Sequence, residues 1–293
     1  MACRLILNAD DLAQSSGINE GIFLAHRDGI LTSASIMATG HAFEHALSLC
    51  RINPSLDLGI HLALVEEQPL SAPDSIPSLI SDSGRMHSDH VTFVSRYYRG
   101  KIDLNEVRIE LDTQIQRVLS SKLAISHING HQHLHMLPGI LAVVIELARK
   151  YGVQALRIPR ERCRAYMLRE AHRTPGRLMQ LLALNSLCAT TKVNNLITTD
   201  HFVGFFYGGR MNSEHLKKVI RHLPSEGTCE LMCHPGVEVD PSSKILGGYD
   251  RRPDLEALLD PEVTRIMQDA GIEPISYREL VANKSGPDVQ SAH

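Results

Sequence analysis

The sequence predicts an α/β fold: a TIM-like (β/α) barrel, regular or distorted, that forms one domain and carries an inserted helical or loop segment. Short apolar runs alternate with longer amphipathic segments along the 293 residues. This alternation is typical of a parallel sheet covered by helices. Polar residues also follow several of the apolar runs directly. An open doubly wound sheet fits the same alternation, and both folds place ligand sites at the carboxyl ends of their strands.

Each expected strand is a short apolar run that ends in polar or turn-forming residues. The strands are expected at residues 5–9, 32–38, 56–64, 124–129, 155–158 and 229–233. The expected helices place apolar residues at helical spacing, as Val107, Leu111 and Ile115 do. Pro138 favours a helix start because the first helical position accommodates proline well. The helices are expected at residues 17–29, 41–53, 105–121, 138–151 and 213–222.

Residues 1–283 are expected to form the single domain, and the polar residues 284–293 to form a disordered tail. The stretch at 162–212 departs from the regular alternation. In this stretch an apolar segment with Met179 and Leu182 runs into a turn-rich sequence that ends in Gly208-Gly209. Two interpretations are open for it: a lid or insertion over the strand ends, or an ordinary outer helix followed by a loop.

Composition and charge argue against several functional classes. Lys and Arg number 30 against 33 Asp and Glu, a net charge of -3, whereas a general binder of nucleic acid carries a clear positive excess. There is no Gly-rich phosphate loop and no G-x-S-x-G motif, which argues against a nucleotide cofactor and against a serine hydrolase. No apolar run is long enough for a signal peptide or a membrane span. The six scattered cysteines are interpreted as reduced thiols, so we expect a cytoplasmic protein.

Polar residues at the ends of four expected strands point to a metal-dependent active site. Because the carboxyl ends of parallel strands lie on one face, residues far apart in sequence are expected to converge there. One carboxylate and two imidazoles make an open site for a divalent cation. A second carboxylate beside the cation can take the proton of an attacking water. The strand-end residues are Asp10, Asp11, His61, His131, His133, His135 and His234.

Spacing alone leaves the roles of the aspartates and of the histidine cluster open. Asp10 and Asp11 fit a general base beside a metal ligand, but an aspartate pair after a strand also fits a turn or a helix N-cap. In an extended chain His131, His133 and His135 share one face, whereas in a helix only His131 and His135 do. The spacing therefore does not identify which histidine of the cluster binds metal.

Two further residues also have alternative interpretations. His234 follows the last expected strand and precedes a proline, so it fits either a proton donor to a leaving group or a turn residue. Arg157 follows Ala155-Leu156 near the end of an expected strand. Its guanidinium can bind a carboxylate or sugar hydroxyls, or it can form a structural salt bridge.

An ordered set of motifs resembles the YdjC-type carbohydrate deacetylases, most of all the hopanoid-biosynthesis (HpnK) type. The resemblance runs from about residue 4 to 282, and the order of the motifs is more specific than any one of them. The main motifs are N-A-D-D at 8–11, G-I-x-x-A-H-R-x-G-I-L-T-S-A-S at 21–35, G-I-H at 59–61, H-I-N-G-H-Q-H-L-H at 127–135 and M-C-H-P at 232–235.

The resemblance implies a (β/α) barrel-like fold and the hydrolysis of an N-acetyl group on a sugar. It assigns Asp11, His61 and His131 to one divalent metal ion, Asp10 to the general base and His234 to the active-site acid. Two nitrogens and one oxygen favour Zn²⁺, with Co²⁺, Ni²⁺, Mg²⁺ and Mn²⁺ as alternatives. Further residues are expected on the substrate side: Arg157, His133, His135 and, near the C-terminus, Tyr249, Arg251, Arg252 and Glu256.

The resemblance to the HpnK type suggests an N-acetylglucosamine-bearing glycolipid as substrate. The apolar residues in 178–206 would then meet a lipid tail or the surface of the inner membrane, and a homodimer is a family-level expectation. Two alternatives remain: a deacetylase of soluble chitooligosaccharides, and a metal-dependent sugar-binding module without turnover. The chain has Asn129-Gly130 where relatives often carry Asp-Ser. A neutral asparagine lacks the charge of a second-shell carboxylate.

Overall fold

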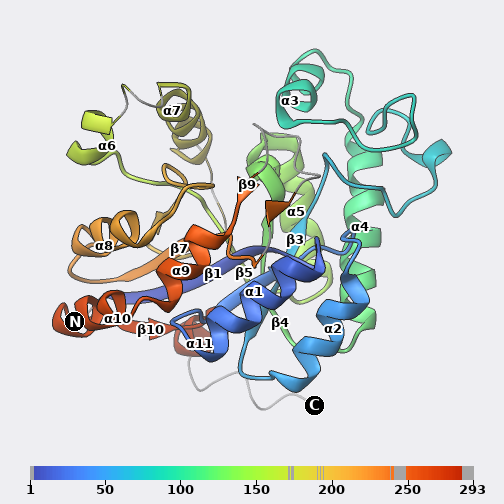
Figure 1. Ribbon diagram of the computed structural model, residues 1–293. Coiled ribbons are helices and arrows are strands. Elements are labelled where there is room, and N and C mark those ends of the chain that lie inside the picture. Colours follow the sequence, from blue (N-terminus) through green and yellow to red (C-terminus); the bar gives the residue numbers. More distant parts are fainter. Residues whose placement is uncertain are drawn as a thin grey trace.

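Helices cover the outside of a curled parallel sheet in the computed structural model of the protein (Figure 1). The structure describes residues 3–170, 172, 175–189, 191, 193, 195–237, 239–240 and 249–285. The strands of this sheet are β1 (Arg4–Leu12), β2 (Ser33–Ile36), β3 (Asp57–Leu62), β4 (Ile125–Gly130), β5 (Ala155–Leu156), β6 (His201–Val203), β7 (Thr228–Cys233) and β10 (Glu273–Ile275).

The strand order is β5-β4-β3-β2-β1-β7-β6, and β10 pairs with the first residues of β1. All of these pairs are parallel. Isolated parallel bridges between Ala155 and Ile197 and between Glu161 and Phe202 connect the two ends of the sheet. The predicted (β/α) barrel-like fold is therefore confirmed, and the bridged ends distinguish it from an open doubly wound sheet.

Strand β1 lies at the centre of the sheet, with β7 on one side and β2 and β10 on the other. Both of its faces are covered, because every residue after Arg4 is buried. A strand that is covered on both sides needs a continuous apolar run rather than an alternating one. Leu5-Ile6-Leu7 provides that run, and the polar residues that follow lie at the end of the strand.

The helices begin where the sequence supplies capping groups. Ser15 accepts a hydrogen bond from the N–H of Ile18 at the start of α1, and Asp103 accepts one from Asn105 at the start of α4. The helices are α1 (Ser16–Arg27), α2 (Phe43–Ile52), α3 (His90–Tyr98), α4 (Leu104–Ser120), α5 (Pro138–Lys150), α6 (Ala165–Glu170), α7 (Pro175–Ala189), α8 (Ser213–Arg221), α9 (Arg252–Leu259), α10 (Pro261–Asp269) and α11 (Tyr277–Ser285). Two 3₁₀ turns, η1 (Pro73–Ser75) and η2 (His131–Met136), and an antiparallel pair, β8 (Val239–Asp240) with β9 (Tyr249–Asp250), complete the described elements.

All five helices and all six strands expected from the sequence are present, with ends shifted by a few residues. The two strands of the main sheet that the sequence pattern does not predict, β6 and β10, have only three residues each, too few to show a period. The stretch at 162–212 contains α6, α7 and β6, so its last part is a strand of the main sheet. Of the tail expected at 284–293, residues 286–293 lie outside the described residues, and Ser285 ends α11.

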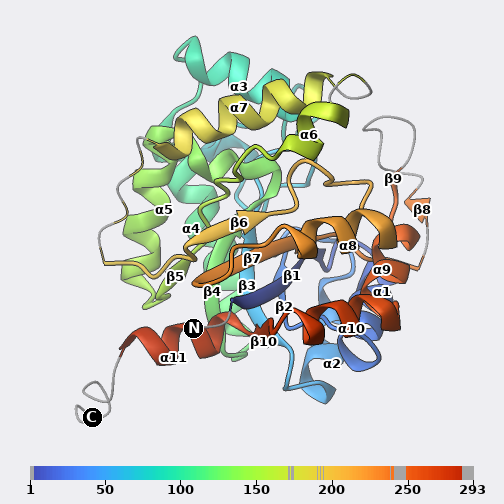
Figure 2. The ribbon, with the colours of Figure 1, turned by 90° about the vertical axis from the view of Figure 1, so that its left-hand side faces the viewer.

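Helices α3, α6 and α7 all lie toward the upper end of the molecule in both views, with α6 and α7 on one side and α3 on the other in Figure 1 (Figures 1 and 2). Helix α3 belongs to the connection after β3, and α6 and α7 follow β5, so these helices stand on the side of the carboxyl strand ends. Their outer surface, called the rim below, exposes large apolar side chains: Val91, Tyr98, Leu168, Met179 and Leu182. Within the described parts of the chain, no helix combines the length and apolar character needed to cross a membrane.

Candidate metal centre and active site

Strand β1 ends in a kink that turns two consecutive carboxylates toward one region. The register between β1 and β2 shifts between Ala9 and Leu12. Asp11 has a left-handed backbone with φ 67°, and Ala13 has φ 84°, values that are uncommon for residues other than glycine. Asp10 and Asp11 therefore do not point to opposite faces as neighbours in a regular strand do.

Asp11, His61 and His131 converge at the ends of β1, β3 and β4. Asp11 Oδ1 lies 3.3 Å from His61 Nε2 and 3.1 Å from His131 Nδ1. One ligand atom from each residue lies within 4.8 Å of the other two, and all three side chains are buried. Two imidazole nitrogens and one carboxylate oxygen fit the donor set of a divalent transition metal and leave positions open for water and substrate. The residues present therefore fit the cation that the sequence motifs imply.

The two histidines face this centre through different ring nitrogens. The outer nitrogen of His61, Nδ1, lies 2.7 Å from Asn129 Oδ1. The outer nitrogen of His131, Nε2, lies 3.0 Å from Glu66 Oε2. Burial alone lowers the pKa of His131, but hydrogen bonds to Asp11 and Glu66 offset this and raise the pKa well above its ordinary value. Each imidazole is thus held at its outer nitrogen, as is usual for metal-ligating histidines.

Arg251 contacts the oxygen of Asp11 that does not face the histidines. Its Nη2 lies 2.8 Å from Asp11 Oδ2 and 2.9 Å from Gln14 Oε1. Burial by itself raises the pKa of Asp11, but Arg251 and the two histidines hold the pKa well below its usual range. Asp11 is therefore an ionised carboxylate, with Oδ1 directed toward the histidines. Arg251, which was expected on the substrate side, thus contacts this carboxylate.

Asp10 lies beneath the centre in a buried ion pair. Arg157 donates from Nη1 to Asp10 Oδ2 at 2.6 Å and from Nη2 to Asp10 Oδ1 at 2.8 Å. It also donates from Nε to Glu230 Oε1 at 2.8 Å, and Tyr277 donates to the other oxygen of Glu230 at 2.5 Å. Burial raises the pKa of Asp10, yet Arg157 and His61 offset this and keep the pKa far below its ordinary value. Of the two interpretations of Arg157, the salt bridge describes its contacts, since the side chain has no exposed surface.

Asn129 lies between His61 and Arg157, and its oxygen can face only one of them. With the oxygen toward His61, it accepts from Nδ1 at 2.7 Å. With the amide turned over, the oxygen accepts from Arg157 Nη2 at 3.0 Å and the nitrogen faces His61 Nδ1. A cation on Nε2 leaves the ring proton on Nδ1, which then needs an acceptor. An amide oxygen can supply one, so the hydrogen bond at Nδ1 does not require a carboxylate at this position.

His234 follows β7 and lies within electrostatic reach of both aspartates. The N–H of its backbone donates to Asp254 Oδ2 at 2.9 Å, which fixes the turn before Pro235. Burial lowers the pKa of the imidazole to about 4, despite the opposing effect of Asp11 and Asp10. The ring is therefore mainly neutral at pH 7.

His133 and His135 do not belong to the cluster of Asp11, His61 and His131. His133 lies against the rings of Phe202 and Phe205, with ring centres 6.0 and 5.5 Å away, and His135 Nε2 lies 3.2 Å from the backbone oxygen of Arg157. Neither the extended chain nor the helix considered for this cluster forms. The chain takes a 3₁₀ turn in which Gln132 and His133 have positive φ, and this turn separates His131 from the other two histidines.

The residues that sequence reasoning missed are mainly the partners of the ligands. Glu66 lies four residues beyond the end of β3, and Glu230 lies inside β7. The rule that polar residues follow apolar strands covers Glu66, which comes directly after the apolar run ending in Val65. Nothing in the sequence pairs Glu230 with Arg157, because that contact depends on how β7 faces the barrel interior.

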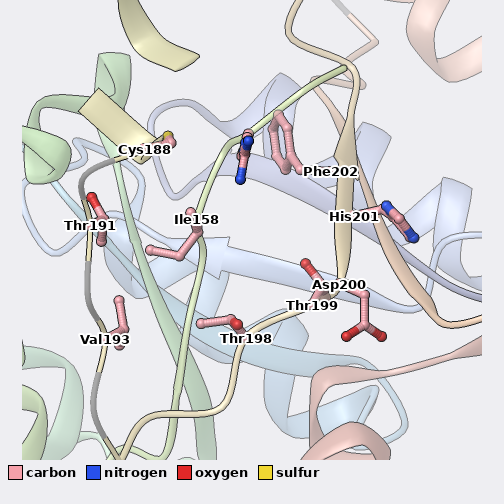
Figure 3. Close-up of a pocket in the computed structure, with 10 residues that line it drawn as sticks. Ile158, Cys188, Thr191, Val193, Thr198, Thr199, Asp200, His201 and Phe202 are labelled. Atoms are coloured by element: carbon pink, nitrogen blue, oxygen red, sulfur yellow. The ribbon is translucent and has the colours of Figure 1, made fainter. Parts of the chain in front are cut away.

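A cavity of about 260 Å³ lies apart from this centre, where β5 and β6 approach each other (Figure 3). Its walls include Ile158, Cys188 and Thr198, together with Asp200 and His201. None of the three converging ligands lines it. The chemistry that the sequence predicts therefore does not depend on this cavity.

Comparison with known proteins identifies the family of the chain. The family model described as YdjC-like protein matches residues 4–269. A protein named carbohydrate deacetylase from Geobacillus stearothermophilus is 32% identical over 276 residues, which cover 94% of this chain and 97% of that protein. One named chitooligosaccharide deacetylase from Proteus mirabilis (strain HI4320) is 29% identical over 287 residues, covering 96% of this chain and all (100%) of that protein.

A solved structure extends the likeness to three dimensions. The putative cellobiose-phosphate cleavage protein from Enterococcus faecalis V583 superposes with a TM-score of 0.77 and 26% identity. The match covers 96% of this chain and 99% of that one. The family model and the relatives match most of the chain, and the chain belongs to the YdjC-like family.

Proposed function

We propose that the protein is a metal-dependent hydrolase that removes the N-acetyl group from an amino sugar. The observation that carries this proposal is the convergence of Asp11, His61 and His131 beside a second ionised carboxylate, Asp10. The deacetylase names of the relatives support the same reaction. When bound by these three residues, a divalent cation would polarise the acetamide carbonyl and acidify a water molecule. Pure sugar binding would not need Asp10 in this place.

Asp10 is proposed as the proton acceptor. Its pKa is held far below the ordinary value, so the carboxylate is ionised at neutral pH and can take a proton. The two hydrogen bonds from Arg157 fix its orientation. They also lower its basicity, so the transfer requires a water that has itself been acidified. Arg157 is then a positioning residue for Asp10.

His234 is proposed to deliver the proton to the leaving nitrogen. Since its pKa lies at about 4, the ring is neutral at the start, so the proton that Asp10 takes from the water must reach His234 before His234 can give it to the leaving nitrogen. Water adds its oxygen to the acetyl carbon, the C–N bond breaks, and the nitrogen leaves as an amine once it is protonated. The products are acetate and a free amino sugar.

For the substrate, we propose an N-acetylglucosamine-bearing lipid of the hopanoid type. The rim supports this choice, because Val91 is 63% and Met179 66% exposed beside the strand ends. Basic residues in or next to the same helices are also exposed, namely Arg99, Lys101, Arg162 and Arg169. Exposed apolar and basic side chains in the same segments suit peripheral contact with an anionic membrane. A lipid-linked sugar would then reach the strand ends from the membrane side.

A deacetylase of soluble chitooligosaccharides is the second candidate, favoured by the name of the Proteus mirabilis relative. The two substrates are distinguished by acetate release from an N-acetylglucosaminyl lipid and from N,N'-diacetylchitobiose in direct competition. Each is tested with Zn²⁺, Co²⁺, Ni²⁺, Mn²⁺ and Mg²⁺ and again after chelation, with Asp11→Ala as the matched inactive variant. Acetate release from neither substrate with any metal would leave a binding module as the better description.

A further inference from the structure

Glu66 contacts His131 from the side opposite Asp11. Its Oε2 lies 3.0 Å from His131 Nε2, while Asp11 Oδ1 lies 3.1 Å from His131 Nδ1. To ligate a cation, the ring must be neutral, and it then carries one proton on one of these two nitrogens. With the proton on Nε2, the ring donates to Glu66 and its lone pair at Nδ1 faces the centre. With the proton on Nδ1, the ring donates to Asp11 and offers that centre no lone pair.

The two carboxylates therefore compete for the ring proton, and the outcome decides whether His131 can ligate a cation. Without Glu66, the ring would retain only the contact with Asp11, which favours the proton on Nδ1. With Glu66, the proton has an acceptor on the outer side. A carboxylate acceptor forms a charge-assisted hydrogen bond, stronger than one to a neutral group.

Glu66 is held in place by its own backbone. The residue has φ 70°, its N–H donates to the carbonyl oxygen of His87 at 2.8 Å, and its carbonyl oxygen accepts from Arg85 Nη2 at 3.2 Å. The side chain is only 15% exposed. Among the described residues, Oε1 has no hydrogen-bond partner, so His131 is the one polar contact there that fixes the carboxylate. The loop after β3 thus presents a fixed acceptor to the ring.

We propose that Glu66 is a positioning residue of the metal centre, which accepts the hydrogen bond of His131 Nε2 and thereby selects the tautomer that leaves Nδ1 for a divalent cation. The inference rests on the proposed function, since it concerns a cation held by Asp11, His61 and His131. His61 differs, because its outer nitrogen meets the neutral amide of Asn129. Of the two imidazoles, only His131 therefore has a charged carboxylate at its outer nitrogen.

The test measures metal affinity rather than turnover. The full chain and its Glu66→Ala and Glu66→Gln variants are stripped of metal and titrated with Zn²⁺ and Co²⁺ against a chromophoric chelator. Glu66→Ala is expected to weaken the affinity for either ion about 10- to 100-fold. Glu66→Gln is expected to lie between this variant and the natural protein, because an amide oxygen accepts the same bond without charge. The Co²⁺ absorption bands should shift in Glu66→Ala, since the ring is no longer fixed.

Glu67→Gln is the matched control. Glu67 is a buried carboxylate one residue away, and its hydrogen bond comes from Gln14 rather than from His131. If contact rather than local charge matters, this variant should bind Zn²⁺ much more tightly than Glu66→Ala does. A role confined to folding would lower the melting temperature of the metal-free protein and leave the Kd unchanged. Natural-protein affinity in both Glu66 variants would overturn the inference, whereas a natural protein that binds no cation would overturn the proposed function itself.

Discussion

The strand ends and the rim differ in burial and charge: the strand ends carry buried, paired charges, whereas the rim exposes apolar side chains. At the strand ends, Asp10 and Arg157 are almost completely buried, and Arg157 donates hydrogen bonds to Asp10 and to Glu230 inside β7. At the rim, Val91 and Met179 expose most of their apolar surface. Buried charges require fixed partners because an unpaired one costs several kcal/mol, about 3–5 when a partner is removed. Exposed side chains carry no such constraint, so the chemistry is expected to depend on the strand ends and the choice of substrate on the rim.

The largest effect is expected from His61→Ala. The substitution removes one of three ligands at a site where the remaining two cannot hold a divalent cation firmly, so metal content and acetate release should both fall to background. Metal analysis of the purified variant and an acetate assay check this. His26→Ala serves as a control, because His26 bonds Ser55 and the backbone of Leu31, away from the strand ends. Full activity in His61→Ala would remove the metal from the mechanism.

Asp10→Asn tests the second carboxylate. The variant should keep its metal but lose kcat by roughly 10²- to 10⁴-fold, the usual contribution of a general base. Arg157 would also lose one of its two carboxylate partners, so the free energy of unfolding must be measured in parallel to separate instability from lost chemistry. Near-normal turnover in a folded Asp10→Asn protein would reject the role of Asp10 as base.

The sequence predicts which residues end the strands, but not which side chains of the loops contact them. His61 was identifiable because it ends an apolar run, and parallel strands bring such ends to one face. The selection of His131 over His133 and His135 was not derivable from spacing, since it depends on positive φ at two residues of a 3₁₀ turn. The partners Glu66 and Arg251 contact ligands 65 and 240 residues away in sequence. Such pairs follow from loop geometry, which local patterns do not encode.

The expected fold was predictable for a related reason. The run Leu5-Ile6-Leu7 and the helical stripe of Val107, Leu111 and Ile115 are buried in the structure. The spacing of apolar residues indicates which residues of a strand or helix face the core. Strands β6 and β10 carry no such signal. Their place in the sheet is determined by longer neighbours, β7 and β1.

Glu161 provides a test at the boundary of the two regions. Its carboxylate accepts from the N–H groups of Gly204 and Phe206 at 3.0 and 2.8 Å, and burial raises its pKa from 4.5 to about 7. The folded protein therefore keeps this proton to a higher pH than the unfolded chain does. The proton on Glu161 therefore stabilises the folded state below pH 4.5. This stabilisation is lost as pH rises from 4.5 to about 7, so the free energy of unfolding falls by about 3 kcal/mol.

The measurement compares the natural protein with Glu161→Gln by chemical denaturation between pH 5 and 8. The difference in unfolding free energy between the two should change over this range in favour of the glutamine variant, which has no proton to lose. The substitution is also expected to affect stability at every pH, because the glutamine amide can accept only one of the two hydrogen bonds from backbone N–H groups. The change with pH is therefore the informative quantity. Parallel stability curves for the two proteins would contradict the raised pKa.

The smallest effect on stability, and the most selective effect on function, is expected at the rim. In the double variant Met179→Ser and Leu182→Ser, two exposed side chains of α7 become polar, so the free energy of unfolding should change by no more than about 0.5 kcal/mol per site. Hydrolysis of an N-acetylglucosaminyl lipid in anionic vesicles should decline, while hydrolysis of N,N'-diacetylchitobiose should not. The matched control is Ile52→Ser, an apolar side chain of α2 that is 73% exposed and lies away from the rim. Equal loss toward both substrates would show that α7 acts on the strand ends rather than on a lipid surface, and the contrast between the two regions would then no longer hold.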